Sequence, residues 1–500
     1  MTDPLPDLIQ ALCKPGAYAH PVDTVRVVQT HISWVLLAGE FAYKIKKPVC
    51  LTFLDFSTLA LRHRCCLAEL ELNSRFAPDI YLGVVGIGSG QAGWVMDSHC
   101  EPIEYAVKMR RFDEACRLDH VCQRDALTPE HLSDLALSLS ALYARAPLAD
   151  PASGFGGLAD ITRQALDNFG DAMRLLREPA WQDRLQRVRE WTLAELQVLA
   201  PVIAERQRSG HVRECHGDLH MANMVLINGQ VQVFDCIEFA EDLRWIDIAS
   251  DVAFLYVDLL AGERSGLANW WLSEVLCASD DHAAMALLPF YTVYRAMVRL
   301  KVACIQSTQT GVIQPQVATY LSLAERLMTP APAQLLITHG LSGSGKTVAS
   351  GAWLLQSAQG MRVRLRADIE RKRLFGLDAL ANSQSAPGQG IYSAQASQKT
   401  YAHLRALASA AIHAGCSVVV DASFLRRADR DAFADLAACT GAHFQILPAE
   451  ARISELRARI RARLASGHDA SEANLTVLEQ QLKAIEPLTR QERAKVFRPA

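Results

Sequence analysis

The 500-residue sequence lacks several features that mark common classes of protein. Its thirteen cysteines include no C-x-x-C pair and no regular spacing, which favours a reduced, cytoplasmic protein with ordinary core and surface thiols. No uncharged apolar run of about 18 residues occurs, so we expect no membrane span or membrane partner. Residues 1–10 lack the basic and apolar segments of a secretory signal. The net charge of −3 argues against a protein that coats nucleic acid.

Half of the residues are apolar, and a chain of this length is expected to form about two to four domains. A proline-rich break at 329–333 separates two parts of different pattern. Residues 1–328 are predicted to form an α+β domain of two lobes, a small lobe over about 1–104 and a helical large lobe over about 111–328. Residues 334–500 are predicted to form an α/β domain, in which helices flank a parallel sheet.

The stretch His216–Asp235 organises the first part of the chain. It begins with His-Gly-Asp-Leu-His-Met-Ala-Asn, and the turn signal Asn-Gly later joins two short apolar runs. Asp218 and Asn223 therefore stand just before a predicted hairpin, and Asp235 ends its return strand. Protein kinases use this layout, in which one Asp takes the proton of the attacking hydroxyl and an Asn and a later Asp hold Mg²⁺. The alternative is a polar loop closed by Asx turns.

A predicted strand over 41–47 carries two lysines of interest. Period-two alternation puts Lys44 and Lys46 on one face of this strand. In a kinase-like small lobe such a strand carries the lysine that contacts the α- and β-phosphates, and we choose Lys44, with Lys46 as the alternative. Glu69, on a helix predicted over 57–76 and capped by Ser57, is the candidate partner of that lysine. A solvated basic edge strand and a surface carboxylate are the competing interpretations.

The form His-Gly-Asp-x-His-x-x-Asn resembles the aminoglycoside phosphotransferase family, together with choline and fructosamine kinases, more than it resembles protein kinases. The resemblance implies a kinase-like fold with Asp218 as catalytic base and Asn223 and Asp235 as Mg²⁺ ligands. It also implies that Lys44 and Glu69 contact ATP. A strict glycine-rich loop before Lys44 is missing, so the sequence does not define which residues would cover the nucleotide phosphates.

The sequence after Asp235 resembles a subfamily of such proteins that bacteria often carry fused to a small kinase domain, and this resemblance covers nearly the whole chain. Asp247 and Asp251 are expected to cap a helix or to brace the catalytic loop. Glu238 lies three residues beyond Asp235 and is a further candidate for contact with Mg²⁺ or with a cationic acceptor.

A phosphate-binding motif follows the proline-rich break. A short apolar strand is predicted over 334–338, and the next residues read Gly-Leu-Ser-Gly-Ser-Gly-Lys-Thr at the start of a helix. In G-x-x-x-x-G-K-[ST] the backbone N–H groups cradle phosphates, the lysine reaches the β- and γ-phosphate oxygens, and the hydroxyl binds Mg²⁺. The predicted binding residues are Gly340, Ser342, Gly343, Ser344, Gly345, Lys346 and Thr347.

Two carboxylates stand at the ends of further predicted strands, over 363–367 and 418–421. Ligands bind beyond the carboxyl ends of parallel strands, so Asp368 and Asp421 are expected beside the phosphate-binding loop. We assign Asp368 as the base that activates the acceptor and Asp421 as the carboxylate that holds the metal through water. The reverse assignment stays open.

An arginine-rich segment over about 452–475 is predicted to form a lid. Arg457 and Arg461 stack one helical turn apart, where like charges repel by a few tenths of a kcal/mol unless an anion neutralises them. A lid that closes over a triphosphate would supply that anion, with Gly467–Ala473 as its turn. The alternative is a solvated basic face.

The second domain resembles small P-loop kinases such as gluconate kinase, chloramphenicol phosphotransferase and zeta-toxin-like kinases. Together the two domains predict an ATP- and Mg²⁺-dependent phosphotransferase, in which each module moves a γ-phosphoryl group to a hydroxyl of a small-molecule acceptor. One alternative is a catalytic P-loop module with a regulatory kinase-like module. Others are an ATPase that drives conformational change, or a polynucleotide 5′-hydroxyl kinase, since basic stretches at 362–373 and 452–463 permit a nucleic-acid substrate.

Overall fold

The computed structural model describes residues 6–30, 32–51, 54–90, 93–386, 388–466 and 470–498. By internal contacts the chain forms two compact units: Met1–Asp160 with Glu205–Asp251, and Ile161–Ala204 with Val252–Ala500. The predicted domain boundary at 329–333 lies inside the second unit, because helix α9 (Ser265–Ser279) packs against the P-loop sheet. Within the described ranges no helix is both long and apolar enough to cross a membrane.

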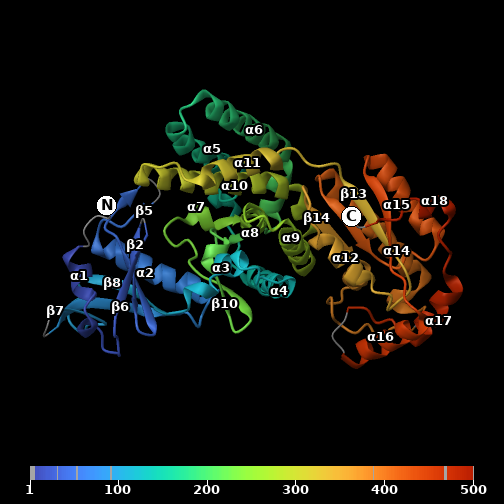
Figure 1. Cartoon of the computed structure of the whole chain (residues 1–500), viewed down its shortest axis with the longest axis horizontal. Coiled ribbons are helices and arrows are strands. Elements are labelled where there is room, and N and C mark those ends of the chain that lie inside the picture. Colours follow the sequence, from blue (N-terminus) through green and yellow to red (C-terminus); the bar gives the residue numbers. More distant parts are fainter. Residues whose placement is uncertain are drawn as a thin grey trace. The chain divides into compact units, whose positions relative to one another are not determined.

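A six-stranded antiparallel sheet is the centre of the first unit, with the order β1-β2-β3-β8-β6-β7 (Figure 1). Its strands are β1 (Val25–Gln29), β2 (Ser33–Ala38), β3 (Phe41–Lys46), β6 (Tyr81–Gly90), β7 (Gly93–Met96) and β8 (Glu104–Arg110). In β3, Tyr43 and Ile45 join an apolar core with helix α1 (Asp7–Leu12). Lys44 and Lys46 face the opposite side, as the period-two pattern predicts.

Helix α2 (Leu59–Ser74) packs against β6 and β8. Its cap is Thr58, whose Oγ1 accepts a hydrogen bond from the N–H of Leu61 at 3.3 Å. The prediction of Ser57 as the cap was wrong by one residue, because the N–H of Ser57 donates to Asp55 Oδ1 and Ser57 belongs to the preceding turn.

The predicted catalytic hairpin is formed by β10 (Met224–Ile227) and β11 (Gln230–Val233). Asn228 and Gly229 join the strands with φ values of 52° and 79°, which is the left-handed pair that an Asn-Gly hairpin turn requires. The unit also contains α3 (Leu118–Gln123), α4 (Pro129–Arg145), β9 (Val212–Glu214), α7 (Glu241–Arg244) and β12 (Trp245–Asp247). Thr128 caps α4 and Pro129 occupies its first turn, as the sequence predicts.

A helical layer contributes much of the second unit's core. Buried apolar side chains from several of its helices meet there, among them Val257, Met297 and Leu321. The helices are α5 (Leu158–Leu175), α6 (Pro179–Arg208), α8 (Ile248–Ala261), α9, α10 (Leu288–Thr310) and α11 (Pro315–Leu327).

A four-stranded parallel sheet of order β14-β15-β13-β16 forms the P-loop part of this unit (Figure 1). Its strands are β13 (Gln334–His339), β14 (Arg362–Arg366), β15 (Ser417–Asp421) and β16 (His443–Pro448). Its helices are α12 (Lys346–Leu355), α13 (Ala367–Leu374), α14 (Ala394–His413), α15 (Arg427–Thr440), α16 (Ile453–Ser466), α17 (Leu475–Ala484) and α18 (Arg490–Arg493). Val496 forms an isolated parallel bridge with Ile446, so the chain continues the sheet by one residue only. Both predicted fold classes, α+β followed by parallel α/β, are confirmed.

Leu336 lies in the central strand β13 with no exposed surface, whereas Leu380 is 66% exposed. We expect Leu336→Ala to lower the free energy of unfolding of the second unit by about 3 kcal/mol, because the cavity left in a packed core is not refilled. Leu380→Ala should change it by about 0.5 kcal/mol or less. Urea unfolding of both variants would test this, and equal losses would contradict the burial of Leu336.

Candidate active sites

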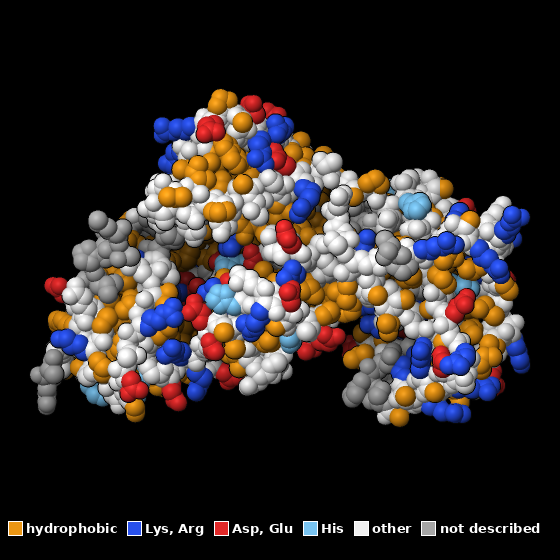
Figure 2. Space-filling view, in the orientation of Figure 1, with side chains coloured by type: hydrophobic (Ala, Val, Ile, Leu, Met, Phe, Trp, Pro, Cys, Tyr) orange, Lys and Arg blue, Asp and Glu red, His pale blue; other side chains and the backbone are white. Residues whose placement is uncertain are grey.

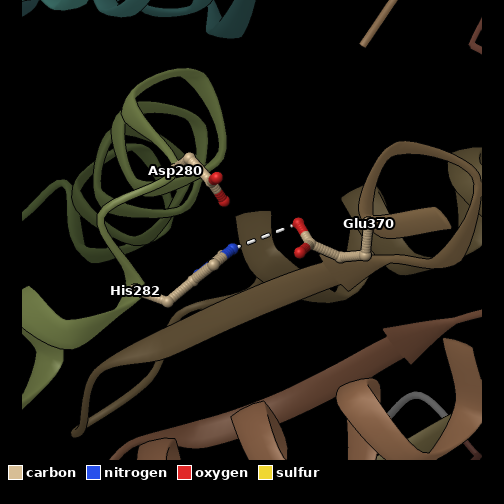
Figure 3. Close-up of side chains that lie close together, drawn as sticks. All are labelled: Asp280, His282 and Glu370. Atoms are coloured by element: carbon tan, nitrogen blue, oxygen red, sulfur yellow. Dashed lines mark hydrogen bonds and ion pairs between the residues drawn. The ribbon is translucent and has the colours of Figure 1, made fainter. Parts of the chain in front are cut away.

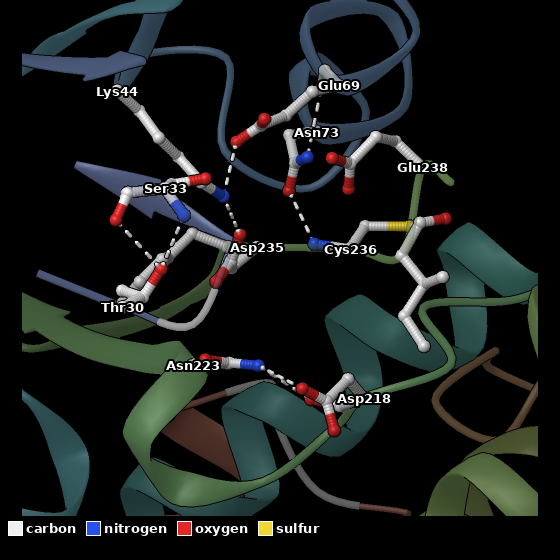
Figure 4. A network of polar contacts seen from close by, with 12 residues as sticks. Thr30, Ser33, Lys44, Glu69, Asn73, Asp218, Asn223, Asp235, Cys236 and Glu238 are labelled. Atoms are coloured by element: carbon white, nitrogen blue, oxygen red, sulfur yellow. Dashed lines mark hydrogen bonds and ion pairs between the residues drawn. The ribbon is translucent and has the colours of Figure 1, made fainter. Parts of the chain in front are cut away.

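The stretch His216–Asp235 gathers the three predicted polar residues in one place (Figure 4). Asn223 Nδ2 donates to Asp218 Oδ2 at 2.9 Å and to the Asp218 carbonyl at 3.1 Å. Asp235 follows β11 with a φ of 66°, a left-handed conformation that costs an L-residue about 1 kcal/mol or more. This turn directs the Asp235 carboxylate to Lys44 of β3.

Asp251, at the start of α8, braces the loop that carries Asp218. Its fully buried carboxylate accepts hydrogen bonds from the backbone N–H groups of His216 at 2.9 Å and Gly217 at 3.0 Å. A third bond comes from the Tyr143 hydroxyl at 2.8 Å. Bracing the loop is one of the two roles expected for this residue. The other, helix capping, is taken by Asp247, which accepts from the N–H of Ala249.

The local structure explains why His216 and Gly217 occupy the first two positions of the motif. Burial lowers the pKa of His216, and its Nε2 lies 3.0 Å from the carbonyl of Phe234, so a neutral ring that donates from Nε2 suits the site. Nδ1 is then the acceptor for the N–H of Asp218. Gly217 has a φ of 85°, and a Cβ there would lie 2.6 Å from the carbonyl oxygen of Leu243, so only glycine fits.

We expect Asp251→Asn to lower the free energy of unfolding of the first unit by about 2 kcal/mol. An amide has one acceptor oxygen in place of two, and its NH₂ would face backbone donors. The amide protons of His216 and Gly217 should also exchange faster with solvent. The exposed Asp134→Asn on α4 is the matched control, and unchanged exchange in Asp251→Asn would contradict the bracing role.

A buried ion network lies beneath strand β3 (Figure 4). Lys44 Nζ is 2.8 Å from Glu69 Oε1 and also contacts Asp235. Lys46 Nζ contacts the other Glu69 oxygen and Glu238. Lys46 is fully buried, whereas the Lys44 side chain is 11% exposed, so Lys44 is the lysine that reaches the open side. Glu238, a sequence candidate for contact with metal or acceptor, forms an ion pair with Lys46.

The pKa shifts show how the network shares its charge. Burial would raise the pKa of Glu69, but Lys44 and Lys46 together lower it below its ordinary value. Burial would likewise lower the pKa of Lys44, but Asp235 and Glu69 raise it well above its ordinary value. Burial raises the pKa of Glu238, and the nearby Glu69 charge adds to this, although Lys46 and Lys44 oppose the shift.

Three carboxylates and two ammonium groups leave one negative charge in excess, and Asp218 nearby adds a second. A divalent cation would balance this excess. Carboxylate and amide oxygens are the ligands that Mg²⁺ prefers, so Asp235 and Asn223 fit the predicted metal-binding roles in chemistry.

We expect Glu69→Gln to lower the free energy of unfolding of the first unit at neutral pH by about 3–5 kcal/mol, because two buried lysines lose their shared anion. A carboxyl with a lowered pKa contributes stability above its ordinary value of 4.5, and this stability is lost as the pH falls below that value. The difference between wild type and Glu69→Gln should therefore shrink from about pH 7 to about pH 3. Urea unfolding at both pH values is the test, with the exposed Glu71→Gln of α2 as control. A pH-independent difference would contradict the ion network.

Thr30, after β1, and Ser33, at the start of β2, are joined by side-chain hydrogen bonds. Thr30 Oγ1 accepts a hydrogen bond from the N–H of Ser33 at 2.9 Å, and the Thr30 hydroxyl donates to the Ser33 carbonyl at 3.2 Å. Both residues lie near Lys44 in Figure 4.

Asn73 was missed by sequence reasoning. Its Oδ1 accepts from the N–H of Cys236 at 2.8 Å, and its Nδ2 donates to the Glu69 carbonyl at 2.9 Å. It thus ties α2, one turn after Glu69, to the residue after Asp235. A polar residue four positions after Glu69 on the buried face of a helix was the available signal.

The P-loop has the strand–loop–helix context that its motif predicts. Gly340, Gly343 and Gly345 have φ values of 156°, 80° and 97°, which an L side chain rarely adopts. A Cβ on Gly340 would lie 2.3 Å from the carbonyl oxygen of Ala449, so this glycine permits a close backbone approach. Gly345 precedes α12, whose first N–H groups face the loop and favour an anion.

A cavity of about 560 Å³ opens at the P-loop. Of the predicted residues, it is lined by Ser342, Gly343, Gly345, Lys346, Thr347, Asp368 and Asp421. Gly340 and Ser344 support the loop from outside the lining. The structure therefore gathers both strand-end carboxylates and the P-loop lysine around one cavity.

Within this cavity Lys346 Nζ donates to the carbonyl of Leu341 at 2.8 Å. Burial lowers the pKa of Lys346, although Asp421 and Asp368 oppose the shift. The N–H of Ser342 donates to Gln481 Oε1 at 2.8 Å, a contact from α17 that the motif does not suggest. Lys346 and this N–H are groups that the motif assigns to phosphate, and both are engaged by protein oxygens.

The arginine-rich helix α16 presents two different faces. Arg459 and Arg463 line the cavity, and Arg459 Nη1 lies 3.3 Å from the carbonyl oxygen of Gly343. Arg457 and Arg461, which the sequence analysis named, are not among the lining residues, and Arg457 lies 3.9 Å from Glu479. Figure 2 shows the basic side chains gathered over this helix. Two residues along a helix turn the side chain by about 200°, so the pair that faces the P-loop is the neighbouring one.

The predicted turn of the lid lies partly outside the described residues, at 467–469. On its described side, Glu472 accepts from the N–H of Ser383 at 2.8 Å and lies 3.2 Å from Lys372 Nζ. These contacts hold the end of the lid segment against the P-loop part of the unit.

Two family models match separate parts of the chain. Residues 115–288 match the phosphotransferase enzyme family, and residues 335–488 match a family described as an AAA domain. The first match identifies residues 115–288 as part of a phosphotransferase domain. The chain combines a domain of the phosphotransferase enzyme family with a P-loop kinase-like domain, as its sequence motifs predict.

Relatives that align with both parts of this chain occur in mycobacteria. Uncharacterised proteins of Mycobacterium tuberculosis and Mycobacterium bovis are 29% identical over 461 residues, which cover 91% of this chain and 90% of theirs. Among solved structures, a choline/ethanolamine kinase family protein from Mesorhizobium loti is similar at 12% identity and a TM-score of 0.39, over 64% of this chain and 93% of that one. An amicoumacin kinase in complex with AMP-PNP and Ca²⁺ is similar at 13% identity and a TM-score of 0.41, over 65% and 93%.

Proposed function

We propose that this protein is an ATP- and Mg²⁺-dependent phosphotransferase with two separate sites, each of which moves a γ-phosphoryl group to a hydroxyl of a small molecule. The proposed domains are residues 1–328 and 334–500. The observation that carries the proposal is the contact of Lys44 with both Glu69 and Asp235, from positions up to 191 residues apart, beside the Asp218–Asn223 pair. This set contains the charges that phosphoryl transfer needs.

In the first site Asp218 accepts the proton of the attacking hydroxyl. Asn223 orients its carboxylate by a hydrogen bond at 2.9 Å. Lys44, held by Glu69, contacts the α- and β-phosphates, and Asn223 and Asp235 would hold Mg²⁺, which when bound neutralises the triphosphate. The contacts of Lys44 with Glu69 and Asp235, beside the Asp218–Asn223 pair, support catalysis at this site over a purely regulatory role.

In the second site the P-loop N–H groups and Lys346 hold the phosphates, and Thr347 would hold Mg²⁺. Asp421 Oδ2 lies 3.4 Å from Ser350 Oγ, one turn along α12 from Thr347, which supports a metal-side role for Asp421. Asp368 then serves as the base toward the acceptor. Arg459 and Arg463, which line the cavity, replace Arg457 and Arg461 as the proposed lid contacts to the triphosphate.

Separate inactivation of the two sites tests the proposal. We expect Asp218→Asn to slow one phosphorylation reaction by about 10²–10⁴-fold, through loss of the base. Lys346→Ala should slow a different one by about 10²-fold or more, through loss of charge stabilisation. The purified full chain would be incubated with labelled ATP and a metabolite extract, and the labelled products identified.

The exposed substitutions Asp134→Asn and Lys399→Ala are the matched controls. If Asp218→Asn leaves every product unchanged, the first site is not catalytic. If ATP is consumed at the same rate without any acceptor, the protein is an ATPase rather than a kinase. Label found on oligonucleotide 5′ ends in place of small molecules would point to a polynucleotide kinase.

A further inference from the structure

The edge of the P-loop sheet is covered by α9, a helix from the stretch that matches the phosphotransferase enzyme family. Strand β14 is the edge strand, and its outward N–H groups at Arg362 and Arg364 donate to Asn269 Oδ1 and Ser273 Oγ, each at 3.0 Å. The two acceptors are one helical turn apart on α9 and are 1% and 2% exposed. The helix thus satisfies backbone donors that an open sheet edge would leave to solvent.

The approach of α9 to the P-loop helix is close. A Cβ on Gly266 would lie 2.1 Å from the carbonyl oxygen of Leu355, the last residue of α12, so a side chain larger than hydrogen does not fit. Trp270 packs against the core that contains Trp353 and Leu354 of α12. The contact therefore combines apolar packing with satisfied hydrogen bonds, as a domain core does.

Arg364 connects this contact to the P-loop itself. Arg364 is 5% exposed, and its guanidinium lies over the ring of Trp270 at 5.2 Å. Nη2 donates to Glu274 Oε1 at 2.8 Å, and Nη1 donates to the carbonyl of Thr347 at 3.1 Å. One arm of the guanidinium is thus held by α9, and the other holds the backbone of the residue whose hydroxyl is the proposed metal ligand.

A second anchor joins the segment after α9 to helix α13 (Figure 3). The His282 ring lies 3.1 Å from Glu370 Oε1, and His403 lies 3.1 Å from Glu370 Oε2. Burial would raise the pKa of Glu370, but hydrogen bonds and charge from His282, with Arg373, lower it to about 2. Glu370 is one helical half-turn beyond Asp368, the proposed base of the second site.

Asp280, His282 and Glu370 lie within 4.8 Å of one another and offer ligand atoms of the kind that bind metals. The Arg373 guanidinium, however, is 2.8 Å from Glu370 Oε1 and 3.4 Å from Asp280 Oδ1. A cation already stands between the two carboxylates, and a metal ion would be repelled by it. The cluster is therefore an ion-pair network that fastens α13 to the segment after α9.

We propose that the segment 265–286 is a structural part of the P-loop site and that Arg364 is its positioning residue. Glu274 and Trp270 fix the guanidinium, and the guanidinium fixes the Thr347 carbonyl, so that the Thr347 hydroxyl meets Mg²⁺ when a magnesium nucleotide binds. The P-loop module then depends on the phosphotransferase-family domain for its geometry. The inference rests on the proposed nucleotide binding at this cavity, and not on phosphoryl transfer.

Nucleotide binding by the full chain tests this inference. The probe is a non-hydrolysable ATP analogue, titrated with and without Mg²⁺, and the binding that Lys346→Ala abolishes is assigned to the P-loop site. Arg364→Lys keeps a positive charge but replaces the planar fork, whose two nitrogens bond the Thr347 carbonyl and Glu274 separately, by a single nitrogen. We expect it to bind the magnesium complex about ten-fold more weakly, the effect of one lost charge-assisted hydrogen bond. Binding of the metal-free analogue should change by less than about two-fold, since the P-loop N–H groups are untouched.

The exposed Arg405→Lys on α14 is the matched control and should bind both forms as the unaltered chain does. If Arg364→Lys does not fold, Glu274→Gln tests the same link from α9, with the exposed Glu263→Gln as its control. Equal loss with and without Mg²⁺ would mean that the contact only stabilises the fold, and no loss would mean that it does not position Thr347. Either result overturns the inference, as does the absence of any binding that depends on Lys346. A chain that binds the analogue but transfers no phosphate would refute the proposed function alone.

Discussion

Charge buried inside a protein needs a partner at close range, and the first site is arranged around Glu69 for this reason. Its two carboxylate oxygens are shared between Lys44 and Lys46, so one helix residue holds two positions of strand β3 at once. Lys44 also contacts Asp235, which follows the β10–β11 hairpin. Strand β3, helix α2 and the hairpin are therefore linked through one carboxylate and the lysine that it holds.

The second site positions its charged and polar groups in a different way. The groups that its motif assigns to an anion are backbone N–H groups and the start of α12, and the left-handed glycines Gly343 and Gly345 shape the loop that presents them. Such a site needs little side-chain charge beneath it, and the carboxylates Asp368 and Asp421 stand at strand ends around its cavity. The two sites thus differ in whether buried ion pairs or backbone geometry place the charges.

The edge strand of the P-loop sheet forms hydrogen bonds with helix α9, which lies outside the P-loop part of the chain. Asn269 and Ser273 satisfy the edge strand β14 from positions 93 and 91 residues earlier in the chain. Arg364, on the same strand, donates a hydrogen bond to the carbonyl of Thr347. A sheet edge that is covered by a helix cannot pair with strands of other chains. Helix α9 therefore protects the edge strand of the P-loop sheet.

The sequence alone determined the features that rest on local patterns. These are the fold classes, the Asn-Gly hairpin, the shared face of Lys44 and Lys46, and the P-loop, since turn chemistry and periodicity act over a few residues. Tertiary structure decided the rest. Whether Arg459 or Arg457 faces the cavity depends on the rotation of α16 against the P-loop, and the partners of Glu238 and Arg364 come from distant parts of the chain. The sequence gives the type of each side chain and its spacing from near neighbours. Which charged side chains come into contact is decided by the packing of elements that are distant in the sequence.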